Sequence, residues 1–335
     1  MDAAYSSPLD RISVVLCTHN GSRFIAEQLE SILHQTRSAF ELIIQDDYSD
    51  DGSVEILKSY AQRYPFIQLY PNKISKGINE NHLSAMAKTK GEYIAISYQN
   101  DIWDRKKLER QMFCIRGSSL SFHPVVPLLK KTPDEIDIDR REPNFGLERL
   151  AFSNMISGNT MLIRRDLMEK VLNMPKSILE PILHQMNFDV VIAIIAAAYG
   201  RIKYCDNVYV FQRVTAQMMS NYEKMPLKDD ISILGYVMNA IGERKNFEKK
   251  KPCIMNRLKV VRSILYQFPD APHSAEAISF IDCYMEGKYL KTAGMCIRLR
   301  DRLLKYPDSK KLASIVRSAL FPMTCCEYNI PDIKQ

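Results

Sequence analysis

A short apolar run that ends in amide, carboxylate and indole groups constrains the fold of this chain most strongly. Residues 93–96 read Tyr-Ile-Ala-Ile, and residues 97–103 continue as Ser-Tyr-Gln-Asn-Asp-Ile-Trp. A buried strand that ends in this way delivers polar side chains to the carboxyl edge of a sheet, where open α/β sheets bind ligands. Asp101 is the first candidate for holding a metal or a phosphate-linked charge. The alternative is that Asn100 and Asp101 only turn the chain and cap the next helix.

Three strand-turn-helix units precede this run. β-rich segments at 12–17, 41–45 and 66–70 each end in a polar turn, and apolar residues at helical spacing follow each of them. This alternation predicts a parallel sheet with helices on its faces. The fold class that we expect is therefore α/β, Rossmann-like, with a mostly parallel sheet.

Length and charge set limits on domains and partners. The chain has 335 residues, which is enough for one large domain, expected at 1–222, and a helical, basic region at 223–335. Its formal charge is +7. Within this C-terminal region, residues 298–305 place basic side chains beside an apolar stripe. This pattern either packs internally or lies on an anionic membrane surface. Outside the C-terminal region no basic groove with interleaved aromatic residues is evident, so we expect no nucleic acid partner.

Cysteine usage and hydropathy indicate the compartment. The eight cysteines form no Cys-x-x-Cys pair and no zinc spacing, so we expect reduced thiols. The N-terminal residues carry no signal pattern, and the longest apolar run, 190–199, is well short of the ~18 residues that a spanning helix needs. We expect a cytoplasmic protein that is at most attached peripherally to the inner face of the cell membrane.

The chain resembles the inverting family 2 glycosyltransferases with the GT-A fold, through three motifs in order. These are Ser13-Val-Val-Leu-Cys-Thr-His-Asn-Gly21, then Ile43-Ile-Gln-Asp-Asp-Tyr-Ser-Asp-Asp-Gly-Ser53, then Gly91-Glu-Tyr-Ile to Gln99-Asn-Asp-Ile-Trp103. Rhamnosyltransferase-like members that build bacterial capsule and O-antigen polysaccharides look most similar, over roughly residues 12–213. The resemblance implies transfer of a hexosyl or deoxyhexosyl group from a UDP-, dTDP- or GDP-sugar to a saccharide or lipid-linked acceptor.

The resemblance also implies roles for particular residues. Those implied to hold the nucleotide are Thr18, Asn20, Gly21, Asp46, Asp47, Lys76 and Arg213, and those implied to lie near the donor sugar or acceptor are Gln99, Trp103 and Gly158. Each role has a structural alternative. Residues 46–51 can form a turn and a helix cap, Lys76 and Arg213 can be solvated surface residues, and Trp103 can belong to the core.

The third motif departs from the family pattern. Relatives commonly read Asp-Gln-Asp-Asp-Ile-Trp and use its carboxylates to hold a divalent cation, whereas this chain has Tyr98 and Asn100 at two of those positions. Asp101 and Asn100 are the implied ligands for Mg²⁺ or Mn²⁺, which prefer anionic oxygen ligands. Three outcomes stay open: a metal held weakly, a metal-free site that uses Lys or Arg, and a protein that binds nucleotide without transferring sugar.

The catalytic base of the family begins a helix later in the chain. The matching segment is Phe188-Asp-Val-Val-Ile, so the resemblance gives Asp189 the role of taking the acceptor proton. Its alternative role is to cap the helix. A loop expected at 117–146 would order over the donor and exclude water. A dinucleotide-binding oxidoreductase is disfavoured, because Thr18-His-Asn-Gly-Ser-Arg supplies one glycine where that class needs three.

Overall fold

The chain divides into two compact units that alternate along the sequence. Unit 1 comprises Met1–Arg140, Ile156–Asn173 and Ile202–Met225, and unit 2 comprises Arg141–Met155, Met174–Arg201 and Pro226–Gln335. The computed structural model describes residues 10–128, 142–213, 238, 242, 244–304 and 311–324. The predicted domain boundary at 222 and the middle of the expected lid, 129–141, lie outside the described residues, so both stay predictions.

Unit 1 is built on a mostly parallel sheet, as the strand-helix alternation predicts. Its strand order is β3-β2-β1-β4-β8-β6-β9. The strands are β1 (Ile12–Thr18), β2 (Glu41–Asp46), β3 (Ile67–Pro71), β4 (Tyr93–Tyr98), β6 (Leu120–Phe122), β8 (Leu162–Arg164) and β9 (Ile202–Tyr204). β1 pairs in parallel with both β2 and β4, whereas β8 runs antiparallel to β4 and β6. The order reverses beside β1, which makes the carboxyl ends of β1 and β4 the switch point of the sheet.

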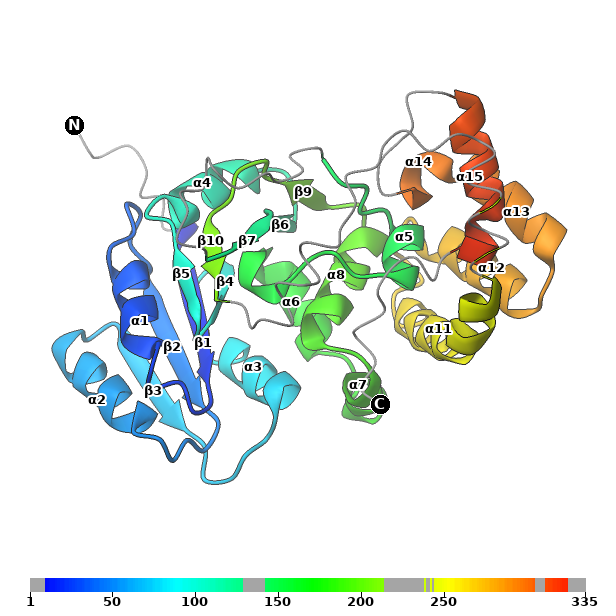
Figure 1. Ribbon diagram of the computed structural model, residues 1–335. Helices are drawn as coiled ribbons and strands as arrows, with labels where there is room; N and C mark the ends of the chain where they lie inside the picture. The colour runs from blue at the N-terminus through cyan, green and yellow to red at the C-terminus, as the bar shows by residue number, and fades with distance from the viewer. Residues whose placement is uncertain are drawn as a thin grey trace. The chain divides into compact units, whose positions relative to one another are not determined.

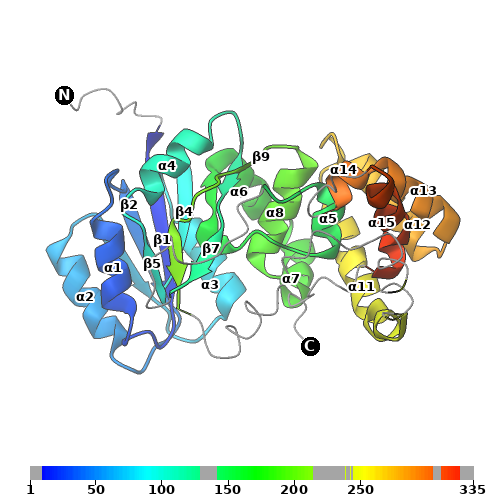
Figure 2. The same cartoon turned by 45° about the horizontal axis from the view of Figure 1, so that its top comes forward.

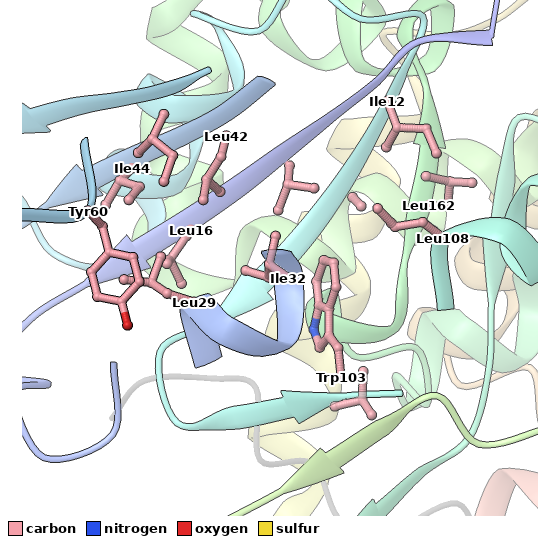
Figure 3. Close-up of a cluster of buried hydrophobic side chains, with 14 of the residues drawn as sticks. Ile12, Leu16, Leu29, Ile32, Leu42, Ile44, Tyr60, Trp103, Leu108 and Leu162 are labelled. Carbon is pink, nitrogen blue, oxygen red and sulfur yellow. The ribbon is translucent and has the colours of Figure 1, made fainter. Parts of the chain in front are cut away.

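Helices cover both faces of this sheet. α1 (Ile25–Leu33) and α2 (Ser53–Arg63) lie on one face, and α3 (Ile78–Met86) lies on the other (Figure 1). Figure 2 shows the same arrangement from a second direction. Alternate residues of each strand face α1 and α2, so that Leu16, Leu42 and Ile44 pack with Leu29 and Ile32 in one cluster (Figure 3).

A second, three-stranded sheet lies in unit 1. It has the order β5-β10-β7, from β5 (Asp101–Trp103), β7 (Val125–Pro127) and β10 (Val210–Gln212). β5 and β10 run antiparallel, with Asp101 opposite Gln212. The remaining helices of unit 1 are α4 (Lys107–Cys114) and α6 (Arg165–Leu172).

Three sequence expectations differ from the structure. Residues 117–128 do not form a continuous loop, because β6 and β7 lie there, and three-residue strands are too short to show an alternating pattern. The run Met155-Ile-Ser-Gly-Asn-Thr-Met-Leu-Ile163 also predicts a strand, interrupted by Gly158, but the strand begins only at Leu162, since a 3-10 turn, η3 (Gly158–Thr160), precedes it. Polar side chains that bond within this turn compete with strand pairing. The expected reduced thiols are wrong for Cys114 and Cys205, which form a disulfide with Cα atoms 6.2 Å apart.

Unit 2 is helical where it is described. Its helices are α5 (Leu147–Phe152), α7 (Lys176–Gln185), α8 (Phe188–Ala198), α11 (Arg244–Leu265), α12 (Ser274–Met285), α13 (Tyr289–Arg298), α14 (Arg300–Leu303) and α15 (Lys311–Thr324). α8 is buried along its whole length and ends before Gly200, whose φ of 67° suits glycine. Phe152 of α5 packs edge-on against Phe280, Tyr284 and Phe321. The predicted C-terminal helical region is thus present.

Among the described residues, no single helix is both long enough and apolar enough to cross a bilayer. One pair, α7 with α8, meets the length and composition requirement together, and the two helices are bent by 115°. All of α8 is buried inside the protein.

A buried arginine links two elements of unit 2. Arg257 on α11 is 1% exposed, and it donates to the carbonyl oxygens of Ala151 and Leu150, each at 2.9 Å. These carbonyls belong to the last turn of α5, where the helix supplies no partner. We expect Arg257→Met to lower the unfolding free energy by about 2–4 kcal/mol, because two buried acceptors lose their donor. Chemical denaturation measures the change.

The control is Arg262→Met on the same helix. Arg262 makes a half-exposed ion pair with Asp282, at 2.6 Å. Pairs of this kind contribute about 1 kcal/mol or less. Equal losses in the two variants would contradict the structural role given to Arg257.

Candidate functional site

The carboxylate of Asp46 orders the turn that follows β2. Asp46 is fully buried, and it accepts hydrogen bonds from the Thr18 hydroxyl at 2.6 Å and from the hydroxyl and backbone N–H of Ser49 at 2.6 and 2.9 Å. The first of these bonds ties the end of β2 to the end of β1. Thr18 and Asp46 therefore bond each other in this structure, and they shape the predicted nucleotide loop from within.

The carboxylate of Asp47 has four donors within the protein. They are the side chains of Asn72 and Ser75, each at 2.8 Å, and the backbone N–H groups of Lys76 and Gly77, at 2.7 and 2.9 Å. Burial alone would raise the pKa of Asp47, but these hydrogen bonds lower it below the ordinary value. Asp47 thus holds the segment between β3 and α3 against the end of β2.

The turn after β1 is fastened to the same loop. Asn20 has a left-handed φ of 49°, its N–H donates to the Ser49 hydroxyl, and its side-chain oxygen accepts from the N–H of Asp50. Gly21 N–H donates to the Ser53 hydroxyl at 2.9 Å. The predicted residues Thr18, Asn20, Gly21, Asp46 and Asp47 are therefore brought together by the structure.

Gln99 closes the switch point between β1 and β4. Its side-chain oxygen accepts from the N–H of His19 at 2.8 Å, and its amide donates to the His19 carbonyl at 2.9 Å. A Cβ at residue 21 would lie 2.4 Å from the Gln99 oxygen. Gly21 is needed here for close approach. The loops after β1, β2 and β4 thus form one connected rim at the edge of the sheet where α/β proteins bind ligands.

Asp101 is buried below this rim. The residue is fully buried, and one of its carboxylate oxygens accepts a hydrogen bond from Asn159 at 2.7 Å. Burial raises the pKa of Asp101 to about 7, although Asn159 and the charges of Lys107 and Arg213 act in the opposite direction.

These residues do not fit a resident divalent cation. A hard cation prefers several anionic oxygen ligands, and Asp101 brings one carboxylate that lies beside cationic groups. The amide of Asn100 donates to the Arg213 carbonyl at 3.4 Å. Among the described residues, no group of three or more His, Cys, Asp or Glu side chains is placed to hold a metal ion. The predicted pair Asp101 and Asn100 therefore forms an incomplete ligand set.

A buried lysine, Lys107, interacts electrostatically with Asp101. The Lys107 ammonium donates to Gln111 at 2.7 Å, lies 3.1 Å from Nε2 of His123, and sits 4.7 Å from the centre of the Trp103 ring. Burial lowers the pKa of Lys107 to about 7. Trp103 is 3% exposed and belongs to the core cluster, so its core alternative is the one observed. Sequence reasoning missed Lys107, whose signal would have been a lysine four residues after the only tryptophan.

The other predicted residues of unit 1 lie around the rim. Arg213 forms an ion pair with Glu27, its guanidinium lies 4.7 Å from the Phe24 ring centre, and it donates to the Asn100 carbonyl. Lys76 pairs with Glu80 at 3.1 Å in an exposed i, i+4 contact. Gly158 begins η3, the turn that carries Asn159 to Asp101.

Asp189 belongs to unit 2, at the second residue of α8. It is 8% exposed, and one of its carboxylate oxygens accepts from the N–H of Val190 at 2.9 Å. A carboxylate in the first turn is favoured by the helix dipole. Its role as the base stays a prediction.

The sheet order, the polar rim and the helices on both faces define an α/β protein of the GT-A type. A solved structure with this fold is S. aureus TarS 1-349 in complex with UDP-GlcNAc, which superposes with a TM-score of 0.51 at 15% identity, over 93% of this chain and 90% of that chain. At this identity the likeness concerns the fold alone.

The sequence match is more specific. Residues 13–116 match the model "Glycosyl transferase family 2", and this match confirms the predicted resemblance to that family. EpsE of Bacillus subtilis (strain 168) is 36% identical over 103 residues, 30% of this chain and 37% of EpsE. The UDP-Glc:alpha-D-GlcNAc-diphosphoundecaprenol beta-1,3-glucosyltransferase WfgD of Escherichia coli is 30% identical over 112 residues, 33% of this chain and 43% of WfgD. This chain spans less than half the length of these curated relatives.

The contact between Gly21 and Gln99 can be tested by a double-mutant cycle. We expect Gly21→Ala and Gln99→Ala each to lower the unfolding free energy by about 1–2 kcal/mol, because each removes the two hydrogen bonds to His19. The double variant should lose no more than the larger single loss. Additive losses in urea unfolding would show that the two residues act separately. Gly294→Ala is the control, since a Cβ there meets nothing within 4 Å.

The buried carboxylate gives a pH signature. Because the pKa of Asp101 is raised to about 7, the folded chain binds more protons than the unfolded chain between about pH 4 and pH 7, and stability falls as pH rises through that window. Asp101→Asn should flatten the fall, by about 4 kcal/mol at most. The pKa of Asp47 is lowered in the fold, so its carboxylate stabilises the folded chain above the unfolded pKa of about 4, and this contribution is lost as pH falls below that value. Asp47→Asn should remove this loss of stability at low pH. Unfolding curves at pH 4, 5.5 and 7 measure the Asp101 effect, and curves from about pH 4 downward measure the Asp47 effect.

Proposed function

We propose that this protein is an inverting glycosyltransferase that moves a sugar from a nucleotide-diphospho-sugar to a saccharide or lipid-linked acceptor in bacterial surface polysaccharide synthesis. The family match over residues 13–116 supports the transferase class. The relative WfgD, a glucosyltransferase by name, supports a nucleotide-sugar donor and a diphosphoundecaprenol-linked acceptor. The connected rim at the switch point is the observation that carries the proposal.

The rim suits a nucleotide because its backbone is fixed before a ligand arrives. Asp46 and Asp47 hold the loops on either side of Tyr48, whose φ is 64° and whose side chain is 60% exposed. A loop that needs no rearrangement binds its ligand without a further loss of conformational entropy. The base and ribose then contact the outward groups of this frame, and Asp46 and Asp47 position those groups.

The diphosphate needs positive charge near the end of β4. Arg213 is held there by Asn100 and by Glu27, and the Glu27 side chain is 62% exposed. A donor diphosphate can replace this exposed carboxylate, because an Arg guanidinium binds phosphate oxygens as it binds carboxylate oxygens. The single buried carboxylate of Asp101 favours donor binding that does not depend on Mg²⁺ or Mn²⁺.

Asp189 is the proposed base. Transfer with inversion requires a carboxylate that takes the proton of the acceptor hydroxyl while that oxygen attacks the anomeric carbon and the nucleoside diphosphate leaves. The Val190 N–H occupies one oxygen of Asp189 and fixes the orientation of the carboxylate. The incomplete metal ligand set supports a second candidate, a protein of the same fold that binds the nucleotide and does not transfer sugar.

A donor screen tests the proposal. Thermal shift over UDP-, dTDP- and GDP-sugars, with Mn²⁺ and with EDTA, identifies the donor, and release of nucleoside diphosphate with that donor measures turnover. We expect one nucleotide class to raise the melting temperature. The affinity for that donor should change less than threefold when EDTA removes the metal. A shift without turnover on lipid-linked acceptors favours the second candidate, and the absence of a shift with every donor contradicts both.

The base assignment has a matched control within the chain. Asp189→Asn should lower turnover by about 10³-fold or more while donor affinity changes less than threefold, because the base acts in the chemical step alone. Asp166 occupies the same second position of α6 and accepts from the N–H of Leu167 at 2.9 Å. Asp166→Asn should retain turnover within threefold. If both variants keep full turnover, Asp189 is not the base.

A further inference from the structure

An exposed apolar pair marks the connection between α12 and α13. Gly287, with φ 70°, makes the turn after α12, and α13 begins at Tyr289. Tyr289 is 54% exposed, and Leu290 beside it is 92% exposed. Single exposed apolar residues are ordinary, whereas two large adjacent ones at a helix start form a projecting apolar contact.

Lysines surround this pair. Lys288 and Lys291 flank it in sequence, and both are exposed. The Lys251 ammonium lies 3.5 Å from the Tyr289 hydroxyl, which places the basic first turns of α11 beside the start of α13. The charged residues of the two segments are Lys249, Lys250, Lys251, Lys288 and Lys291, with Glu248 and Glu286 as their acidic neighbours. Lys288 pairs with Glu286 at 2.5 Å, and the balance of the set is five positive against two negative charges.

The basic, apolar segment at 298–305 does not offer such a surface. Leu299, Leu303 and Leu304 are 5%, 0% and 1% exposed, so the apolar stripe of this segment packs inside unit 2. Arg302 is paired with Glu148 and Glu276. Of the two interpretations of this segment, internal packing is therefore the one observed over its described residues, 298–304.

We propose that Tyr289 and Leu290, with Lys251, Lys288 and Lys291 around them, form a docking surface for an anionic phospholipid bilayer. An apolar pair enters the boundary between headgroups and acyl chains, tyrosine suits that depth because its hydroxyl stays hydrated, and lysines are attracted to anionic headgroups. Charge complementarity selects an anionic bilayer over a neutral one. This surface lies wholly within unit 2, and the proposal does not rest on the proposed glycosyl transfer.

The test is cosedimentation of the full chain with vesicles. Wild-type protein is mixed with vesicles of phosphatidylcholine alone, or with 30% phosphatidylglycerol, in about 50 mM and about 300 mM salt. We expect partition onto the anionic vesicles that is at least tenfold stronger than onto neutral ones and that weakens at the higher salt. Tyr289→Ser/Leu290→Ser should lower this partition at least tenfold, and Lys288→Gln/Lys291→Gln should lower it by about 25-fold at low salt, about fivefold for each lysine.

The matched control is Tyr266→Ser/Leu312→Ser. Tyr266, directly after the last residue of α11, and Leu312 on α15 are the same residue types as the proposed pair, and they are 56% and 62% exposed. This variant should partition like the wild type, and circular dichroism establishes that all variants are folded. Absence of binding to anionic vesicles, or equal partition of the two double serine variants, overturns the proposal. A protein partner at this surface would give the first of these results.

Discussion

Two buried carboxylates determine the architecture of the site. Asp46 ends β2 and Asp47 follows it, and the two carboxylates accept seven hydrogen bonds in total from Thr18 at the end of β1 and from the loops after β2 and β3. A buried carboxylate is costly unless its oxygens are satisfied, so each loop is held where it donates. The rim follows from that requirement, because the loops can take few other positions without leaving a carboxylate unpaired.

Much of unit 1 could be predicted from the sequence, since its first four strands and three helices are long enough to show their periodicity. The same reasoning missed β5, β6 and β7, which have three residues each. Among site residues, the motifs located Gly21 and Asp47 correctly as loop residues. Their partners could not be predicted, because the bonds of Asp47 to Asn72 and Ser75 span more than twenty residues and depend on the tertiary fold. The burial of Trp103 could not be predicted either, since the sequence around a single indole beside a motif does not show whether it faces solvent or the core.

The charge around Asp101 relates two features of the site. The motif has lost carboxylates at Tyr98 and Asn100, and a buried lysine, Lys107, supplies positive charge near Asp101. Several carboxylates around Asp101 would need a cation from solution to offset their repulsion. With Asp101 alone, the charges of Lys107 and Arg213 offset part of the cost of burying this carboxylate, whose pKa burial still raises to about 7. Arg213 is also paired with the exposed carboxylate of Glu27, and the pKa of Lys107 is lowered to about 7, so the excess of positive charge is small until Glu27 is displaced. A donor diphosphate that displaced Glu27 would meet the Arg213 guanidinium directly, so the loss of carboxylates from the motif changes how a donor would be held before it abolishes binding.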